Sequence, residues 1–145
     1  MSDTKTGRVE WRDGLNFNAV GGSGFAFDFS GTSPAEGGSP MEVALLAAAG
    51  CTAMDVISIL QKKRQNVTDF AIEISGKRAG EHPKVYTEMS LTYVVAGEEI
   101  DPEAVARAIE LSMTKYCSVS IMFKQAGIKF NTDFRIEEPA VAAVA

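Results

Sequence analysis

The chain has 145 residues, the size of one domain that can bury a core of its own. Hydrophobic residues make up 46% and charged residues 23% of the sequence, which excludes a disordered chain and a membrane protein. Acidic residues outnumber basic ones by 19 to 14, giving a formal net charge of -5, and Lys and Arg form no cluster with interleaved aromatic residues. We therefore expect no nucleic-acid partner and no anionic membrane surface as a partner.

The first residues, MSDTKTG, contain no apolar stretch, which predicts that the chain carries no signal peptide or lipid anchor. We therefore expect a cytoplasmic protein, in a compartment where structural disulfides are rare. Cys51 and Cys117 lie 66 positions apart, and with His82 they are too few and too scattered for a zinc site, so no metal is expected. The two thiols could form a redox pair, or they could pack as small buried hydrophobes.

Strands are predicted for the N-terminal third of the chain. Apolar residues alternate on both sides of Asp13–Gly14, a dipeptide suited to a tight hairpin turn. These residues are Val9, Trp11, Leu15 and Phe17. A third strand with an aromatic face is predicted from Phe25, Phe27 and Phe29. The residues from Gly31 to Pro40 then predict a loop.

A long helix is predicted to begin at Ser39, which is a good N-cap, with Pro40 at the first helical position and Glu42 completing a capping box. From Val43 to Leu60 the segment is apolar on nearly every face, which indicates a helix buried in a large core or an oligomer interface. Asp55 in its middle argues against a membrane span. A subunit of this size offers little surface to cover such a helix, so we expect a second copy of the chain to do so.

The second half of the chain predicts further strands and two shorter helices. Apolar alternation predicts strands through residues 70–75 and 87–95, with a turn at 80–83. Asp101–Pro102 begins a second helix, a third begins around Cys117–Ser118 and stops at Gly127, and a last strand follows through Ile136.

These elements predict an α+β fold in a single domain of residues 1–145. Its core is expected to span residues 6–137, and residues 138–145 are expected to form a flexible tail.

The surroundings of the two cysteines differ. Cys51 follows small residues that leave room beside its sulfur, but a thiolate on an apolar helix needs a nearby cation or hydrogen-bond donors. Asp55, one turn further on, would oppose ionisation unless a basic group pairs with it; alternatively it anchors a buried polar network. Cys117 opens a short helix, whose free N–H groups favour a thiolate; the alternative is a half-buried cap residue.

Two cysteine motifs together resemble the OsmC/Ohr family, and most closely its YhfA-like branch. The first motif runs from Ser39-Pro40-Met41-Glu42 to Gly50-Cys51-Thr52-Ala53-Met54-Asp55-Val56, and the second is Lys115-Tyr116-Cys117-Ser118-Val119-Ser120. The resemblance extends from about Gly7 to Ile136. It implies an OsmC-like fold and an intertwined homodimer in which two long helices pack centrally, with the active sites at the subunit interface.

The resemblance also implies a function, the thiol-dependent reduction of organic hydroperoxides without metal or organic cofactor. By position, Cys51 would attack the O–O bond and become a sulfenic acid, and Cys117 would condense with it to a disulfide. An external dithiol, a lipoyl group in some branches of the family, would then reduce that disulfide.

The hydroperoxidase branch also carries a glutamate near the start of the cysteine helix and an arginine on the N-terminal hairpin. The glutamate position falls on Met41 here. Glu42 is one residue late and, on an ideal helix, lies about 180° around from Cys51, so we interpret it as the capping partner. Arg12 is the leading candidate for the arginine.

Two other hairpin positions are alternatives: Arg8, and Asn16, where some relatives carry arginine. His82 is expected to be exposed and unrelated to the site. Two rival functions remain: an OsmC-like dimer that senses redox state or binds a small hydrophobic ligand, and a structural dimer with inert thiols.

Overall fold

The computed structural model describes residues 3–139, which divide into two compact units between Ala44 and Leu45. The described residues form two sheets and three helices, so the predicted α+β class is confirmed. Glu138 and Pro139 have neither helix nor strand, and residues 140–145 of the predicted tail lie outside the described residues. The prediction of a single domain stays a prediction.

The first unit contains an antiparallel sheet of β1 (Gly7–Asp13), β2 (Asn16–Gly21) and β3 (Ala26–Ser30). Asp13 pairs with Asn16, so the hairpin loop is Gly14–Leu15, one residue later than the predicted turn dipeptide. Gly14 has a φ of 46°, a left-handed conformation that tight hairpin loops require and glycine adopts without strain. Leu15 is therefore a loop residue, 56% exposed, rather than a strand residue.

The predicted aromatic face of the third strand is present. The ring centroids of Phe25 and Phe27 lie 5.6 Å apart, and those of Phe27 and Phe29 lie 4.7 Å apart. Phe25 precedes the strand and is 68% exposed, and every residue of β1 is exposed, including Trp11 at 65%. This sheet therefore presents large apolar side chains on its own surface.

Helix α1 (Pro40–Lys62) begins with the predicted capping box. The backbone N–H of Glu42 donates to Ser39 Oγ at 3.3 Å, and Ser39 Oγ donates to Glu42 Oε1 at 3.0 Å. The prediction that Glu42 serves as the capping partner of Ser39 is thus confirmed.

The second unit contains a sheet in the order β4 (Asn66–Arg78), β5 (Tyr86–Glu98) and β6 (Lys129–Glu137). β4 and β5 pair antiparallel, whereas β5 and β6 pair parallel. Tyr93 lies opposite Ile72 on one side and Phe134 on the other, so these three residues share the inner face of the sheet.

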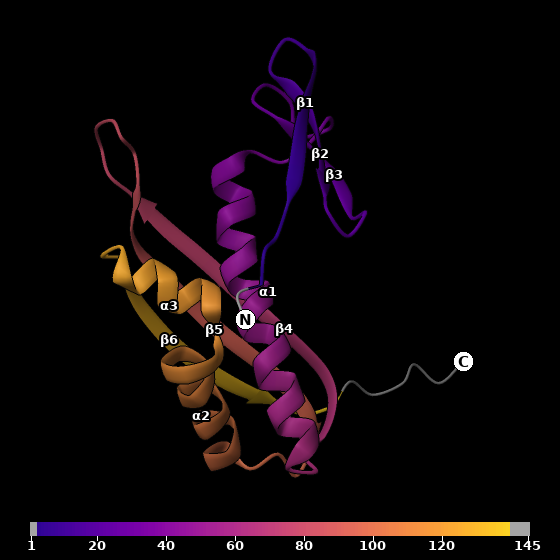
Figure 1. Ribbon diagram of the computed structural model, residues 1–145. Helices are drawn as coiled ribbons and strands as arrows, with labels where there is room; N and C mark the ends of the chain where they lie inside the picture. The colour runs from indigo at the N-terminus through magenta and orange to yellow at the C-terminus, as the bar shows by residue number, and fades with distance from the viewer. Residues whose placement is uncertain (1–2, 140–145) are drawn as a thin grey trace. The chain divides into compact units, whose positions relative to one another are not determined.

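Three helical segments follow β5: α2 (Pro102–Leu111), the π-helical segment η1 (Ser112–Tyr116) and α3 (Ser118–Gln125). Figure 1 shows α1, α2 and α3 on one face of the second sheet. A hydrogen bond from α1 to Tyr93 of β5 identifies this as the inner face. The buried residues of α1 recur at helical spacing along one stripe: Ala48, Ala49, Thr52, Val56 and Leu60.

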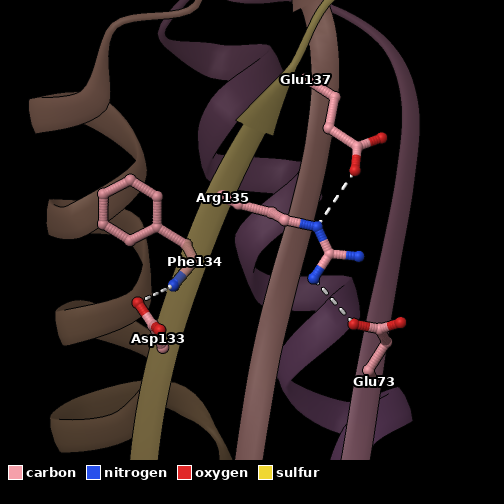
Figure 2. A network of polar contacts seen from close by, with 5 residues as sticks. All are labelled: Glu73, Asp133, Phe134, Arg135 and Glu137. Atoms are coloured by element: carbon pink, nitrogen blue, oxygen red, sulfur yellow. Dashed lines mark hydrogen bonds and ion pairs between the residues drawn. The ribbon is translucent and has the colours of Figure 1, made fainter.

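The opposite face of this sheet is polar. Figure 2 shows Arg135 of β6 reaching across the sheet to Glu73 of β4 while also contacting Glu137. Both ion pairs measure 3.0 Å, but these side chains are half or more exposed, so water screens them and they contribute little to stability.

Helix α1 is, by length and composition, apolar enough to cross a membrane, with a hydropathy of 2.0 in its most apolar window. Of that window, 28% is buried within the chain. Thr52 and Asp55 on this helix are engaged by Tyr93 and Ser112. Such polar anchoring is typical of a core helix.

Candidate active site around Cys51 and Cys117

Cys51 lies in the middle of α1, next to the buried stripe of that helix. It is a free, partly exposed thiol, flanked along the chain by Gly50 and by the fully buried Thr52. Cys51 is therefore less buried than its neighbour Thr52, which anchors the helix in the core.

Cys117 is a free and fully buried thiol between η1 and α3. Its backbone N–H donates to the carbonyl of Ser112, five residues back, at 2.7 Å, which closes the π turn. Its sulfur caps α3 by accepting from the backbone N–H of Ser120 at 3.4 Å, and Cys117 Sγ donates to Ser120 Oγ at 3.0 Å. Cys117 is thus a cap residue, as the alternative interpretation of the sequence predicted. It is fully buried, however, and not half buried.

Burial raises the pKa of the Cys117 thiol above its ordinary value. The hydrogen bonds with Ser120 oppose that rise, and the neighbouring thiol of Cys51 adds to it. The expectation that the N-terminus of α3 would favour a thiolate at Cys117 was therefore wrong in its net effect, because desolvation outweighs the N–H donor. The partly exposed Cys51 thiol and the buried Cys117 thiol therefore lie close enough to interact.

A chain of hydrogen bonds runs beneath Cys51. Thr52 Oγ1 lies 2.8 Å from the hydroxyl of Tyr93 and 2.7 Å from Ser112 Oγ. Ser112 Oγ in turn donates to Asp55 Oδ2 at 2.9 Å. We call these four residues, Tyr93, Thr52, Ser112 and Asp55, the hydroxyl chain. The interpretation of Asp55 as the anchor of a buried polar network is confirmed.

Tyr93 lies at the inner end of the hydroxyl chain and is fully buried. Burial raises the pKa of its phenol to about 12, its hydrogen bond with Thr52 opposes the rise, and the nearby Cys117 and Asp55 add to it. At neutral pH the Tyr93 phenol therefore stays protonated and keeps a hydroxyl proton that it can donate.

Asp55 lies at the outer end of the chain, at a surface hollow of about 460 Å³. Much of the lining of this hollow is apolar. Ser58 and Lys62 are polar residues that line it together with Asp55. The remaining lining residues are Met54, Ile59, Leu111 and Tyr116. The hydroxyl chain therefore extends from Tyr93 in the sheet core to this partly apolar hollow.

Arg12 belongs to the first unit. Its guanidinium lies 3.8 Å from Asp28 Oδ1, and both side chains are about half exposed. Arg12 also lines a hollow of about 310 Å³ with Asp13, Asp28 and Glu36. Its role toward Cys51 stays a prediction.

The alternatives to Arg12 have partners of their own in the same unit. Arg8 lies 3.6 Å from Glu10, and both side chains are exposed. Asn16 accepts from Ser30 Oγ at 2.6 Å and donates to Asp13 at 2.9 Å.

His82 lies exposed in the loop between β4 and β5. Within residues 3–139, no group of three or more His, Cys, Asp or Glu side chains is placed to hold a metal ion.

Sequence comparison places this arrangement in a family. Residues 33–133, which include both cysteines and the whole hydroxyl chain, match the family described as OsmC-like protein. The chain belongs to the OsmC family. Protein YhfA of Escherichia coli K12 is 44% identical to this OsmC-like chain over 119 residues, covering 82% of the chain and 89% of YhfA.

Solved structures of similar proteins support the OsmC-like fold. A hypothetical protein from Aquifex aeolicus is 31% identical, with a TM-score of 0.86 over 96% of this chain and all of that one. The organic hydroperoxide resistance protein OhrB of Bacillus subtilis is 15% identical, with a TM-score of 0.60 over 92% of this chain and 98% of that one. At that identity, OhrB supports the fold alone.

Sequence reasoning missed three members of the site of this OsmC-like protein: Tyr93, Ser112 and Ser120. A signal for the first two was present. Ser112 continues the buried helical spacing of Val105, Ala108 and Ile109, and Tyr93 lies within the apolar alternation of β5. A hydroxyl in register with an apolar stripe requires a buried partner, because an unpaired polar group is costly there.

Proposed function

We propose that this OsmC-like protein is a thiol peroxidase that reduces organic hydroperoxides, with Cys51 as the attacking thiol and Cys117 as the resolving thiol. The observation that carries the proposal is the pairing of a partly exposed Cys51 with a buried Cys117 that interacts with it. OhrB of Bacillus subtilis, a protein of the same fold, is named for resistance to organic hydroperoxides, which supports the substrate class.

The proposed reaction has two steps. In the first, the Cys51 thiolate attacks an oxygen of the hydroperoxide, the O–O bond breaks, and an alcohol leaves with a proton while Cys51 becomes a sulfenic acid. In the second, the Cys117 sulfur attacks that sulfenic sulfur and forms the disulfide. Cys117 gives up its proton as its sulfur attacks, because the thiolate is the nucleophile, and that proton leaves with the sulfenic hydroxyl as water.

An external dithiol then returns the enzyme to its starting state. It reduces the Cys51–Cys117 disulfide to two thiols and is itself oxidised to a disulfide. A lipoyl-type dithiol is the class of reductant that we propose, and such a cycle requires a reducing compartment, so we propose a cytoplasmic location.

We also propose that the protein is a homodimer. On α1, Leu46 is 61% and Met54 is 74% exposed, although the helix is apolar on nearly every face. Apolar area of this kind is typical of a protein–protein interface. A charged residue at position 48 would be a poor test of the dimer. Ala48 is fully buried within the chain, so the charge would destabilise the fold itself.

Met54→Glu is the appropriate test of the dimer. It should yield folded monomer in sedimentation, whereas Val85→Glu, at an exposed residue outside α1, should not change the sedimentation coefficient. Wild-type protein that sediments as a folded monomer at micromolar concentration would refute the dimer.

The peroxidase is tested by counting thiols before and after one equivalent of tert-butyl hydroperoxide. The wild type should lose two thiols, Cys51→Ser should lose none, and Cys117→Ser should accumulate a trappable sulfenic acid on Cys51. Oxidation as slow as in the unfolded chain would instead favour inert thiols. Oxidation of Cys117 before Cys51 would overturn the assignment of roles.

A further inference from the structure

The two thiols are connected through the core by a short path of hydrogen bonds. Thr52 follows Cys51 directly, and its hydroxyl contacts Ser112 Oγ at 2.7 Å. The carbonyl of the same Ser112 accepts the backbone N–H of Cys117 at 2.7 Å. Two hydrogen bonds therefore join the residue beside Cys51 to the backbone of Cys117, although the two lie on separate elements.

Proton counting fixes the direction of every bond in the hydroxyl chain. Ser112 has one hydroxyl proton and donates it to Asp55, so it must accept from Thr52. Thr52 then has no proton left for Tyr93, so the phenol donates to Thr52. Burial keeps that phenol protonated, since its pKa is raised to about 12.

The hydroxyl chain also joins three elements. Thr52 and Asp55 belong to α1, Tyr93 to β5 and Ser112 to η1. The side chains of Thr52, Tyr93 and Ser112 are fully buried, where a hydrogen bond to a lost partner is not replaced by water. Removing one hydroxyl therefore loosens α1 against the segment that carries Cys117.

We propose that the hydroxyl chain is a positioning device that holds the Cys51 and Cys117 sulfurs at the separation from which they form a disulfide. The inference rests on the proposed function only in taking the two cysteines as a redox pair. Thr52 and Ser112 act through the thiols that they place, and neither touches the peroxide. Holding two reacting groups at short separation raises their effective concentration, which favours the bond between them.

The measurable consequence is a redox equilibrium that needs no peroxide. With oxidised dithiothreitol, the Cys51 and Cys117 thiols give up two electrons and two protons and form their disulfide. The disulfide of the probe breaks and takes up those electrons and protons. The equilibrium constant reports how well the two sulfurs are placed.

The experiment equilibrates wild type, Thr52→Val and Thr52→Ser with mixtures of reduced and oxidised dithiothreitol, and the disulfide fraction is measured by mass after alkylation. Thr52→Val removes both buried hydrogen bonds of the Thr52 hydroxyl, to Tyr93 and to Ser112, and should lower the equilibrium constant for disulfide formation roughly three- to tenfold. A tenfold loss corresponds to about 30 mV in reduction potential. Thr52→Ser keeps the hydroxyl and should stay within about twofold of wild type, because its hydrogen bond is retained.

Two further variants complete the test. Ser112→Ala should repeat the loss seen in Thr52→Val, because it removes the next member of the hydroxyl chain. Ser58→Ala removes a hydroxyl of α1 outside that chain and should not change the equilibrium constant. Each variant is first shown to be folded by circular dichroism.

An equilibrium constant in Thr52→Val that equals or exceeds that of wild type would overturn the proposal. So would a wild-type protein that forms no Cys51–Cys117 disulfide in oxidised dithiothreitol. A role in stability alone would lower the thermal midpoints of the oxidised and reduced forms equally and leave the constant unchanged. A normal wild-type equilibrium without hydroperoxide turnover would refute the proposed function and leave this inference standing.

Discussion

Cys117 and Ser120 exchange two hydrogen bonds across the first turn of α3. The thiol donates to Ser120 Oγ at 3.0 Å, and the backbone N–H of Ser120 donates to the sulfur at 3.4 Å. Ser120 is itself fully buried, so this sulfur has a fixed polar partner in an apolar site. Burial raises the pKa of Cys117, and Ser120 limits the rise.

Removing that partner should move the titration of Cys117. In a Cys51→Ser background, Ser120→Ala should shift the Cys117 titration to higher pH, because the hydroxyl that stabilises the thiolate is lost while burial remains. Ultraviolet thiolate absorbance against pH measures this shift. Ser118→Ala, at an exposed neighbour, is the control and should leave the curve in place. A shift to lower pH in Ser120→Ala would contradict the prediction.

Stability should fall at alkaline pH. Cys117 and Tyr93 both have pKa values raised by burial, so the folded state holds their protons more tightly than the unfolded state does. Their contribution is complete below the unfolded pKa values and is lost as the pH rises through the folded ones. For Tyr93 the window runs from 10.0 to about 12, and a pKa change of that size is worth on the order of 3 kcal/mol.

Urea denaturation at a series of pH values measures this fall. Tyr93→Phe should flatten the loss of unfolding free energy above pH 10, and Cys117→Ala should flatten its earlier part, which begins near the ordinary thiol pKa of 9.0. A slope in Tyr93→Phe as steep as in wild type would show that other groups cause the loss.

The capping box of α1 predicts different effects at its two positions. Ser39→Ala should lower the free energy of unfolding by about 1 kcal/mol, because it removes the N-cap acceptor of the Glu42 N–H. Glu42→Gln keeps a side chain that can serve in the box, so both stability and hydroperoxide turnover should stay near wild type. Loss of turnover in a folded Glu42→Gln protein would give Glu42 a catalytic role instead.

Arg12 is predicted to stabilise the thiolate of Cys51. Arg12→Met should therefore slow peroxide attack at pH 7, by roughly tenfold or more, because a close cation in a partly dry site favours the charged nucleophile. Stopped-flow thiol oxidation in a Cys117→Ser background measures it. Arg8→Met is the matched control. Equal rates in wild type and Arg12→Met would move the role to Arg8 or another group.

Local signals in the sequence predicted most of the elements. The start of α1 was predictable because Ser39 and Glu42 lie three residues apart and need only each other. The start of α2 was predictable for the same reason, since Asp101 caps it by accepting from the N–H of Glu103. Alternation predicted β4 and β5 because one face of each strand is more buried than the other.

The site was less predictable because its contacts cross the chain. Thr52 and Ser112 are 60 residues apart, and no pattern in either segment indicates the other. The π turn before Cys117 ends in the hydrogen bond from the Cys117 N–H to the Ser112 carbonyl, and the thiol pKa depends on how deeply the site is buried. The resemblance to the OsmC/Ohr family predicted that the two cysteines act as a pair. Composition and spacing alone did not decide between a redox pair and two inert buried thiols.

The parallel pairing of β5 with β6 also imposes an order on folding. β4 and β5 form a hairpin whose contacts are local, but β6 can join β5 only after the intervening segment of α2, η1 and α3 has crossed the sheet. Cys117 lies within that crossing segment, so we expect its burial to be among the later events. During synthesis we therefore expect a period in which the chain exposes a thiol that the finished protein encloses, and in which Cys117 is open to modification.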